Sequence, residues 1–149
     1  MNLARCSMLG LGLLSALAAV PVRALDFRSV AEPAVLQDGP AAKGKPRYVI
    51  ARATPVELVF DAEGWSKVRD SSGDMTWIET RFLSPRRTVM IRAERAQVRS
   101  QPDDKAALVF EAEKDVVLDL QEAASAGWAK VRHRGGQSGY VRALQVWGL

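Results

Sequence analysis

The sequence predicts an all-β protein with two small β-barrels in tandem, preceded by a cleaved export signal. Three observations support this prediction. Apolar and polar residues alternate over short segments, Gly, Pro, Asp and Ser separate those segments, and one long pattern occurs twice. An isolated sheet of this size is only marginally stable in water. We therefore expect each copy to close into a barrel that hides its strand edges, with little helix.

Residues 1–24 have the features of a signal peptide. A short positive start, Met1–Arg5, precedes the apolar run Met8–Val20, which is too short to span a bilayer. Pro21 ends the run, and small or apolar residues at positions 22 and 24 place cleavage after Ala24. An uncleaved amphipathic or buried helix is the alternative, which the absence of acidic residues in this segment disfavours. The protein is expected to be periplasmic or secreted.

The composition of the processed chain excludes several kinds of site. Cys6 precedes the apolar run, whereas a lipid-modified cysteine would follow it, so we predict no membrane anchor. The remaining chain has no cysteine, which excludes internal disulfides and thiolate zinc sites. Loss of Arg5 and Arg23 leaves 19 basic and 17 acidic residues. This balance argues against a nucleic-acid partner.

The repeat defines the domain organisation. Residues 31–40 recur at 93–102, and Gly64–Arg69 recurs as Gly127–Arg132. Between these anchors three apolar positions of the first copy align with three of the second, namely Val56, Leu58 and Phe60 with Val116, Leu118 and Leu120. The predicted units are a signal peptide at 1–24, a first barrel at 25–87 and a second barrel at 88–149.

The expected elements follow in order along each copy. Val56, Leu58 and Phe60 share one face of a strand, and in Trp65–Arg69 the residues Ser66 and Val68 point away from Trp65. A Gly-containing turn and a short aromatic strand at 77–79 follow, and then a single helical turn at 80–83. The predicted interior of the first barrel consists of Leu36, Leu58, Val68 and Ile78.

The junction between the copies is short and contains one proline, Pro85, so we expect the two barrels to hold a restricted mutual orientation. The strand around Thr88 to Arg92 could complete the first barrel or open the second. After Val146 little chain remains for a closing strand. The second barrel is therefore expected to pair with the junction strand or to stay partly open.

The motifs resemble the bacterial SH3-like domain. The resemblance rests on Ala96–Pro102, on Gly127–Arg132 and on the Gly-Tyr-Val run at 139–141. The first copy departs from the pattern at Leu36-Gln37 and Thr76-Trp77. The resemblance implies an exported tandem SH3-like protein. In relatives with a peptidoglycan hydrolase such domains are thought to hold the enzyme on the cell wall, but no hydrolase is attached here.

Enzymatic chemistry has little support in the residues. The chain has one histidine, His133, which lies in a polar hairpin between two arginines and is interpreted as a solvated turn residue. The carboxylates Asp103, Asp104, Glu111 and Glu113 lack the spacing of a calcium loop. We therefore expect no enzyme activity, no cofactor and no metal site.

The candidate ligand-binding residues are the aromatics on the non-core side of the alternation, namely Trp65, Trp77, Trp128 and Tyr140. Such rings suit sugars, proline or extended peptide. The alternative is that they cover a barrel end or contact the other domain. Trp128 is expected to be the more buried of the two Gly-Trp rings, because the longer segment 122–126 can fold over it. Basic residues around the junction are interpreted as solvated linker and edge charge, or as a site for an anionic partner: Arg81, Arg86, Arg87, Arg92 and Arg95.

The resulting functional hypothesis is a non-enzymatic, exported binding module that recognises cell-envelope material, with a cell-wall polymer, peptidoglycan or its peptide, as the first candidate. The alternative is a protein–protein interaction scaffold that binds another envelope protein through a groove or a strand edge. Neither hypothesis specifies an oligomeric state.

Overall fold

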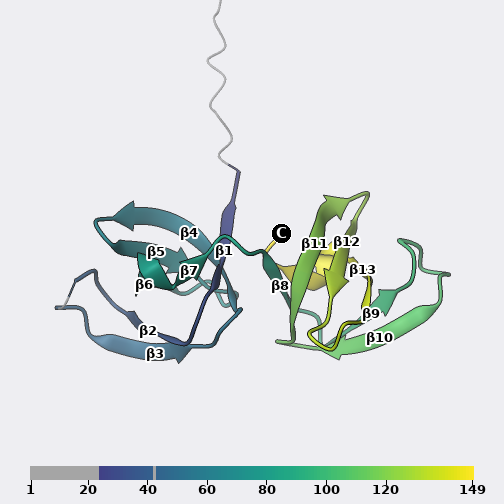
Figure 1. Ribbon diagram of the computed structural model, residues 1–149, viewed down its shortest axis with the longest axis horizontal. Coiled ribbons are helices and arrows are strands. Elements are labelled where there is room, and N and C mark those ends of the chain that lie inside the picture. The colour runs from purple at the N-terminus through teal and green to yellow at the C-terminus, as the bar shows by residue number, and fades with distance from the viewer. Residues whose placement is uncertain (1–23, 42) are drawn as a thin grey trace, which may run out of the picture.

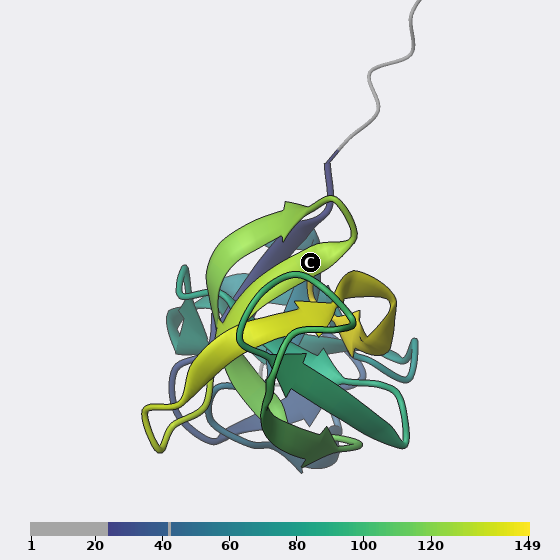
Figure 2. The same cartoon turned by 90° about the vertical axis from the view of Figure 1, so that its right-hand side faces the viewer.

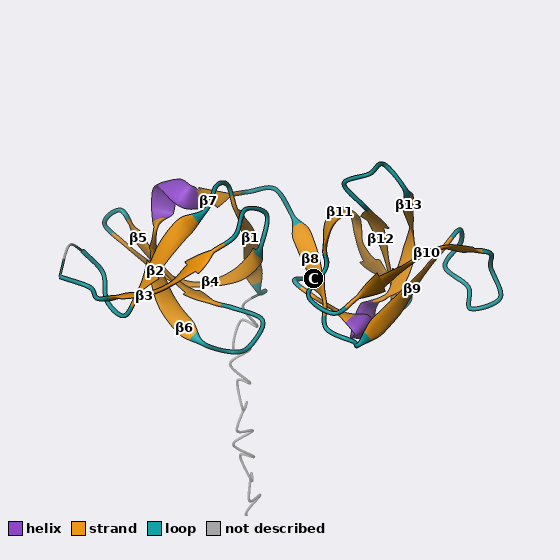
Figure 3. Ribbon diagram, turned by 90° about the horizontal axis from the view of Figure 1, so that it is seen from below, coloured by secondary structure: helices purple, strands orange, loops and turns teal. Residues whose placement is uncertain are grey.

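The computed structural model describes residues 24–41 and 43–149, so the predicted signal peptide lies, apart from Ala24, outside the described residues. Two antiparallel sheets lie side by side along the long axis of the molecule (Figure 1). In the described part of the chain the only helices are two single 3₁₀ turns, η1 (Thr80–Phe82) and η2 (Ala143–Gln145) (Figure 3). The all-β prediction is confirmed.

The first sheet has seven strands in the order β3-β2-β6-β5-β4-β1-β7. Their bounds are β1 (Asp26–Val30), β2 (Ala34–Gln37), β3 (Pro46–Ile50), β4 (Pro55–Ala62), β5 (Trp65–Arg69), β6 (Met75–Glu79) and β7 (Leu83–Ser84).

The second sheet repeats this topology strand for strand, in the order β10-β9-β13-β12-β11-β8-β14. Its strands are β8 (Thr88–Ile91), β9 (Arg95–Arg99), β10 (Leu108–Glu113), β11 (Val117–Ser125), β12 (Trp128–Arg132), β13 (Ser138–Arg142) and β14 (Val146–Trp147). The junction strand β8 pairs with β11 and β14, so it belongs to the second sheet. The expected pairing of the chain's last strand with the junction strand is thus observed.

The prediction of closed barrels is wrong. Each sheet curls around its core (Figure 2), but its hydrogen-bonded order is open, with β3 and β7 at the edges of the first sheet and β10 and β14 at those of the second. β7 and β14 have two residues each, and β3 begins with Pro46, which has no N–H to donate. Short strands and proline thus protect three of the four edges, those of β3, β7 and β14, without closure.

Each sheet encloses its own core. In the first copy Leu36, Val68 and Ile78 are fully buried as predicted, whereas Leu58 is only half-buried and lies outside the core cluster. A β-bulge between Leu58 and Phe60 interrupts the alternation of β4 for the residues that follow Leu58. Val56 is the β4 residue that fills the core. The second core contains Leu118 with Val116 and Leu120 packed against it.

The Gly-Trp motif has the same structural role in both copies. Gly64 and Gly127 adopt φ values of 84° and 82°, in the left-handed region that glycine tolerates best. Their carbonyl oxygens accept hydrogen bonds from the backbone N–H groups of Thr80 and Ala143, at 2.9 Å in each case. The glycine therefore turns the chain into the aromatic strand and also anchors the first residue of the 3₁₀ turn.

Contacts across the junction join the two copies. The rings of Phe27 and Trp147 meet edge-on with centroids 5.0 Å apart, and the buried Thr88 hydroxyl donates to the Ala53 carbonyl at 2.7 Å. Arg86 Nη2 donates to both carboxylate oxygens of Asp119 at 2.6 Å. These contacts favour one arrangement of the two sheets.

A tyrosine on the edge strand β3 is tied to the β5–β6 turn. The Tyr48 hydroxyl donates a hydrogen bond to Asp70, which also accepts from Ser72 and from the Asp74 N–H. Burial, the hydrogen bond to Asp70 and the negative charge of Asp70 raise the pKa of Tyr48 to about 12. The folded state thus favours the neutral phenol.

This contact predicts how stability depends on alkaline pH. The stabilisation from the neutral Tyr48 phenol is fully present below the unfolded tyrosine pKa of about 10. It is lost as the pH rises through the folded pKa of about 12. In a Tyr140→Phe variant, which retains Tyr48 alone, phenolate absorbance should therefore appear near pH 12. A midpoint near that of a free tyrosine would contradict the contact.

Candidate functional site

The register of the strands places matched side chains on the outer face of each sheet. In the first copy Lys67 pairs with Phe60 on β4 and with Trp77 on β6, and Trp77 pairs with Gln37 on β2. We call Phe60, Lys67, Trp77 and Gln37 the first outer row. In the second copy Glu122, Lys130, Tyr140 and Arg99 are paired in the same way and form the second outer row.

Three of the four predicted site residues are half-buried on this outer face, since the residues between them on β5, β6 and β13 point into the cores. Trp65 lies next to the first outer row, opposite Glu79. Trp77 and Tyr140 are members of the two rows. Trp128 occupies the position of Trp65 in the second copy, opposite Arg142. The structure thus groups the predicted residues by copy, as two separate pairs.

The first outer row presents an aromatic pair in which Phe60 is exposed and Trp77 is half-buried. Phe60 is 57% exposed, and its ring meets Trp77 edge-on with the centroids 6.2 Å apart. Lys67 Nζ lies 6.0 Å from the centroid of the Trp77 ring. Phe60 was expected on a core-facing side of its strand, and the bulge in β4 places it outside instead. The period-two pattern in the sequence gives no sign of that bulge.

The second outer row has a charged side chain at the position where the first outer row has the apolar Phe60. Glu122 replaces Phe60 and forms an ion pair with Lys130 at 2.9 Å, and Lys130 Nζ lies 5.9 Å from the Tyr140 ring. The hydrogen bond to Glu122 and its negative charge raise the pKa of Lys130. A pocket of about 240 Å³ is lined by Trp128 and Tyr140 together with residues of the β11–β12 hairpin. Here the two predicted aromatics share one concave surface.

Trp128 is the more buried of the two Gly-Trp rings, as predicted, with 7% exposure, whereas Trp65 is half-buried. The covering group differs from the expectation, because residues 122–126 are exposed. Arg142 lies over the Trp128 ring at 4.4 Å from its centroid and is held by Asp104. At the position of Arg142 the first copy has Glu79, which pairs with Arg81.

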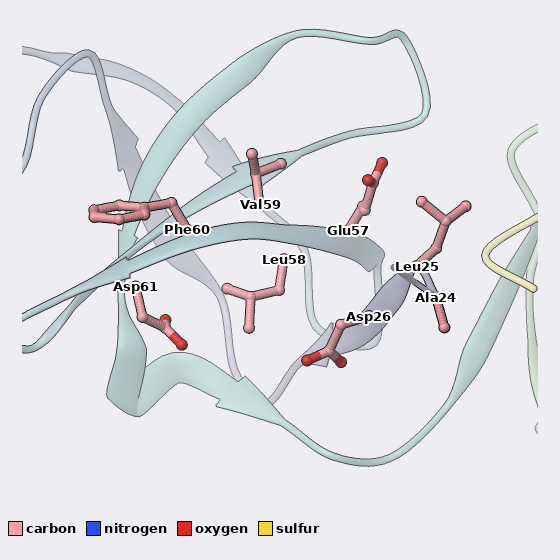
Figure 4. A pocket seen from close by; sticks show the side chains of 8 residues that line it. All are labelled: Ala24, Leu25, Asp26, Glu57, Leu58, Val59, Phe60 and Asp61. Atoms are coloured by element: carbon pink, nitrogen blue, oxygen red, sulfur yellow. The ribbon is translucent and has the colours of Figure 1, made fainter. Parts of the chain in front are cut away.

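A further pocket lies beside the aromatic pair. It has a volume of about 500 Å³ and is lined by residues 24–26 and by Glu57–Asp61 of β4 (Figure 4). Phe60 belongs both to this lining and to the first outer row. None of the four predicted site residues lines the pocket.

Four of the five junction arginines have partners within the protein. Arg81 pairs with Glu79, Arg86 with Asp119 and Arg95 with Glu111. Arg87 donates to the Gly148 carbonyl at 2.8 Å and lies 5.6 Å from the Phe27 ring. These arginines therefore fix local structure and the junction. Arg92 is exposed, as Arg81, Arg86 and Arg95 are, but forms no ion pair with the described residues.

His133 is part of its own turn. Its Nδ1 accepts a hydrogen bond from the Gly135 N–H at 3.1 Å, and its ring lies against Phe110. Across residues 24–41 and 43–149, no three His, Cys, Asp or Glu side chains are grouped closely enough to hold a metal ion. No helix in this part of the chain is long and apolar enough to cross a membrane.

Comparison with known proteins identifies the repeated unit. The sequence profile described as bacterial SH3 domain matches residues 30–85 and again 92–148. A search of curated proteins gave no match.

Similar solved structures include two proteins from Trichomonas vaginalis and one from Bacillus cereus. NlpC2 from T. vaginalis is 13% identical with a TM-score of 0.39 over 85% of this chain and 49% of its own. NlpC1 is 17% identical with a TM-score of 0.39 over 92% and 51%. The NlpC/P60 family protein from B. cereus is 13% identical with a TM-score of 0.37 over 81% and 55%. The chain spans about half the length of these proteins.

Proposed function

The chain belongs to the bacterial SH3 domain family, with one copy in each sheet, and from this premise we propose that it is an exported, non-enzymatic module that binds cell-envelope material. Peptidoglycan or its peptide is the first candidate ligand, and the periplasm or the exterior of the cell is the proposed location. The contact surface is the outer face of the first sheet.

The observation that carries this proposal is the aromatic pair of exposed Phe60 and half-buried Trp77. Phe60 lies outside the core cluster of its copy and exposes 57% of its surface. This aromatic pair, next to a third ring, Trp65, offers flat apolar faces with polar edges, which suit sugar rings and extended peptides. Lys67 next to the pair supplies a positive charge for a peptide carboxylate.

The second copy is proposed as the weaker contact. Arg142 covers the ring of Trp128, and the ion pair Glu122–Lys130 takes the place of the aromatic pair Phe60–Trp77. A ligand would have to displace Arg142 from both Trp128 and Asp104 before it could stack on the ring. The first copy needs no such rearrangement.

A binding role without catalysis fits the arrangement of reactive groups. The Ser66 hydroxyl donates to Asp61 at 2.6 Å but is fully buried, and His133, the single histidine of the chain, lies in the other copy. A serine nucleophile needs an adjacent base and access to substrate. We therefore propose that the module binds envelope material without turning it over.

Retention on purified wall sacculi tests the proposal. The wild-type protein should sediment with sacculi, and Phe60→Ala and Trp77→Ala should each weaken retention by about tenfold or more, since aromatic anchors dominate such contacts. Leu144→Ala is the matched control, because Leu144 is an apolar residue with 92% exposure in η2 of the second copy. Failure of the wild type to bind, or equal retention of all variants, would refute the proposal.

The alternative is a scaffold that binds another envelope protein through a strand edge. The edge strand β3 favours it, because Val49 is 66% exposed and lies opposite the 45% exposed Val35 on β2. Crosslinking in the envelope fraction should then give a discrete protein adduct that Val49→Lys abolishes. Adduct formation without wall retention would favour the scaffold over the wall-binding module.

A further inference from the structure

A second candidate site lies at the junction, away from the outer rows. A pocket of about 320 Å³ is lined by the β5–β6 turn of the first copy and by β8, the β10–β11 turn and β14 of the second. Its lining includes Ser71, Met90, Arg92, Lys114, Asp115 and Trp147. Figures 1 and 3 show β8 and the C-terminus on the side of the second sheet that faces the first.

The walls of the pocket are held together by contacts between the copies. The Ser71 hydroxyl lies 3.4 Å from Met90 Sδ, and the Trp147 ring packs edge-on against Phe27. The hydrogen bond from Thr88 to Ala53 and the ion pair of Arg86 with Asp119 lie at the same junction. Neither copy alone forms this pocket, so the site requires the tandem.

The charges that line the pocket have both signs. Among the described residues no carboxylate lies within ion-pairing distance of Arg92, which is exposed. Lys114 also lines the pocket, and its only ion pair with a described residue is a 3.3 Å contact with the highly exposed Glu94. Asp115 supplies a carboxylate. Met90 and Trp147 provide the apolar part of the lining.

We propose that this junction pocket binds a zwitterionic amino acid or short peptide with an apolar side chain. Arg92 and Lys114 bind the ligand carboxylate, and Asp115 binds its ammonium group. Trp147 and Met90 contact its apolar side chain. The volume is at the lower end of the range for small-molecule sites, which fits a dipeptide. The proposal is independent of wall binding by the outer rows.

Titration of isotope-labelled full-length protein with the dipeptide alanyl-leucine tests the proposal. Saturable shifts are expected for the Trp147 indole N–H and for the backbone amides of Ser71 and Arg92, with a Kd of about 1 mM. Blocking the carboxylate as an amide, or the amine as an acetyl group, should each weaken binding by about tenfold. Arg92→Ala should have the same effect as the amide, without loss of folding, because Arg92 is exposed.

Lys105→Ala is the control, since Lys105 is an exposed cation in the β9–β10 loop, outside the pocket lining. It should bind alanyl-leucine as the wild type does. The proposal is overturned if the wild type shows no saturable shifts, if Arg92→Ala binds unchanged, or if the amide and acetyl forms bind as well as the zwitterion. Because the dipeptide assay involves no wall material, its outcome is independent of sacculus retention.

Discussion

Trp128→Ala should destabilise the second copy by about 3 to 5 kcal/mol, whereas Trp65→Ala should cost the first copy about 1 to 2 kcal/mol. Trp128 is 7% exposed and has Arg142 over its face, so its removal leaves a cavity and an uncovered guanidinium. Trp65 is half-buried on an outer face, where truncation leaves no enclosed void. The larger effect is therefore expected in the copy that exposes less of its Gly-Trp ring.

Urea unfolding followed through amide signals from each sheet separates the two effects. Arg142→Ala is the control, because it removes the covering group and leaves the indole in place, and it should cost less than Trp128→Ala. A larger loss from Trp65→Ala than from Trp128→Ala would show that the packing described for the two rings is wrong.

Gly139→Ala should destabilise the second copy by about 2 to 3 kcal/mol, because there is no room for a side chain at this position. A Cβ atom on Gly139 would lie 2.5 Å from the Arg99 carbonyl oxygen and 2.7 Å from Val98 Cγ1. The nearer atom belongs to the backbone of β9, so the strand itself would have to move. The first copy carries Thr76 at the equivalent position, buried between β2 and β5.

Gly39→Ala is the matched control in the first copy. A Cβ atom there would have a nearest neighbour at 4.0 Å, the Gly44 Cα, which is ordinary van der Waals contact. Its effect on the unfolding free energy should stay within about 0.5 kcal/mol. If Gly139→Ala is as well tolerated as Gly39→Ala, the close approach of β13 to β9 is incorrect.

The fold follows from the sequence to the extent that it depends on the repeat and the two-residue period. The matched Gly-Trp turns and the buried Val68 and Ile78 were predictable, because each is a local consequence of alternation or of glycine at a turn. The exposed Phe60 was not, because one extra residue in β4 reverses the side on which the following residues lie. Barrel closure was not predictable either, since it depends on the length of the edge strands.

The individual residues of the candidate site were predictable from the sequence, but their spatial arrangement was not. Alternation placed Trp65 and Trp77 outside the core, whereas the partner ring, Phe60, joins them only through the bulged register of β4 with β5. Arg142 over Trp128 depends on the β12–β13 pairing and on Asp104 in a distant loop. The junction pocket combines turns from both copies, which no spacing within one copy reveals.

The four tryptophans of the chain allow the central claim to be tested in one spectrum, because Trp65 and Trp77 lie on the first outer face, Trp128 in the second copy and Trp147 at the junction. Soluble fragments released from purified wall would be titrated into isotope-labelled protein while the four indole N–H signals are followed. The account predicts that the Trp77 signal moves in a saturable manner and that Phe60→Ala abolishes this movement. A Trp77 signal that stays fixed while intact sacculi retain the protein would contradict it.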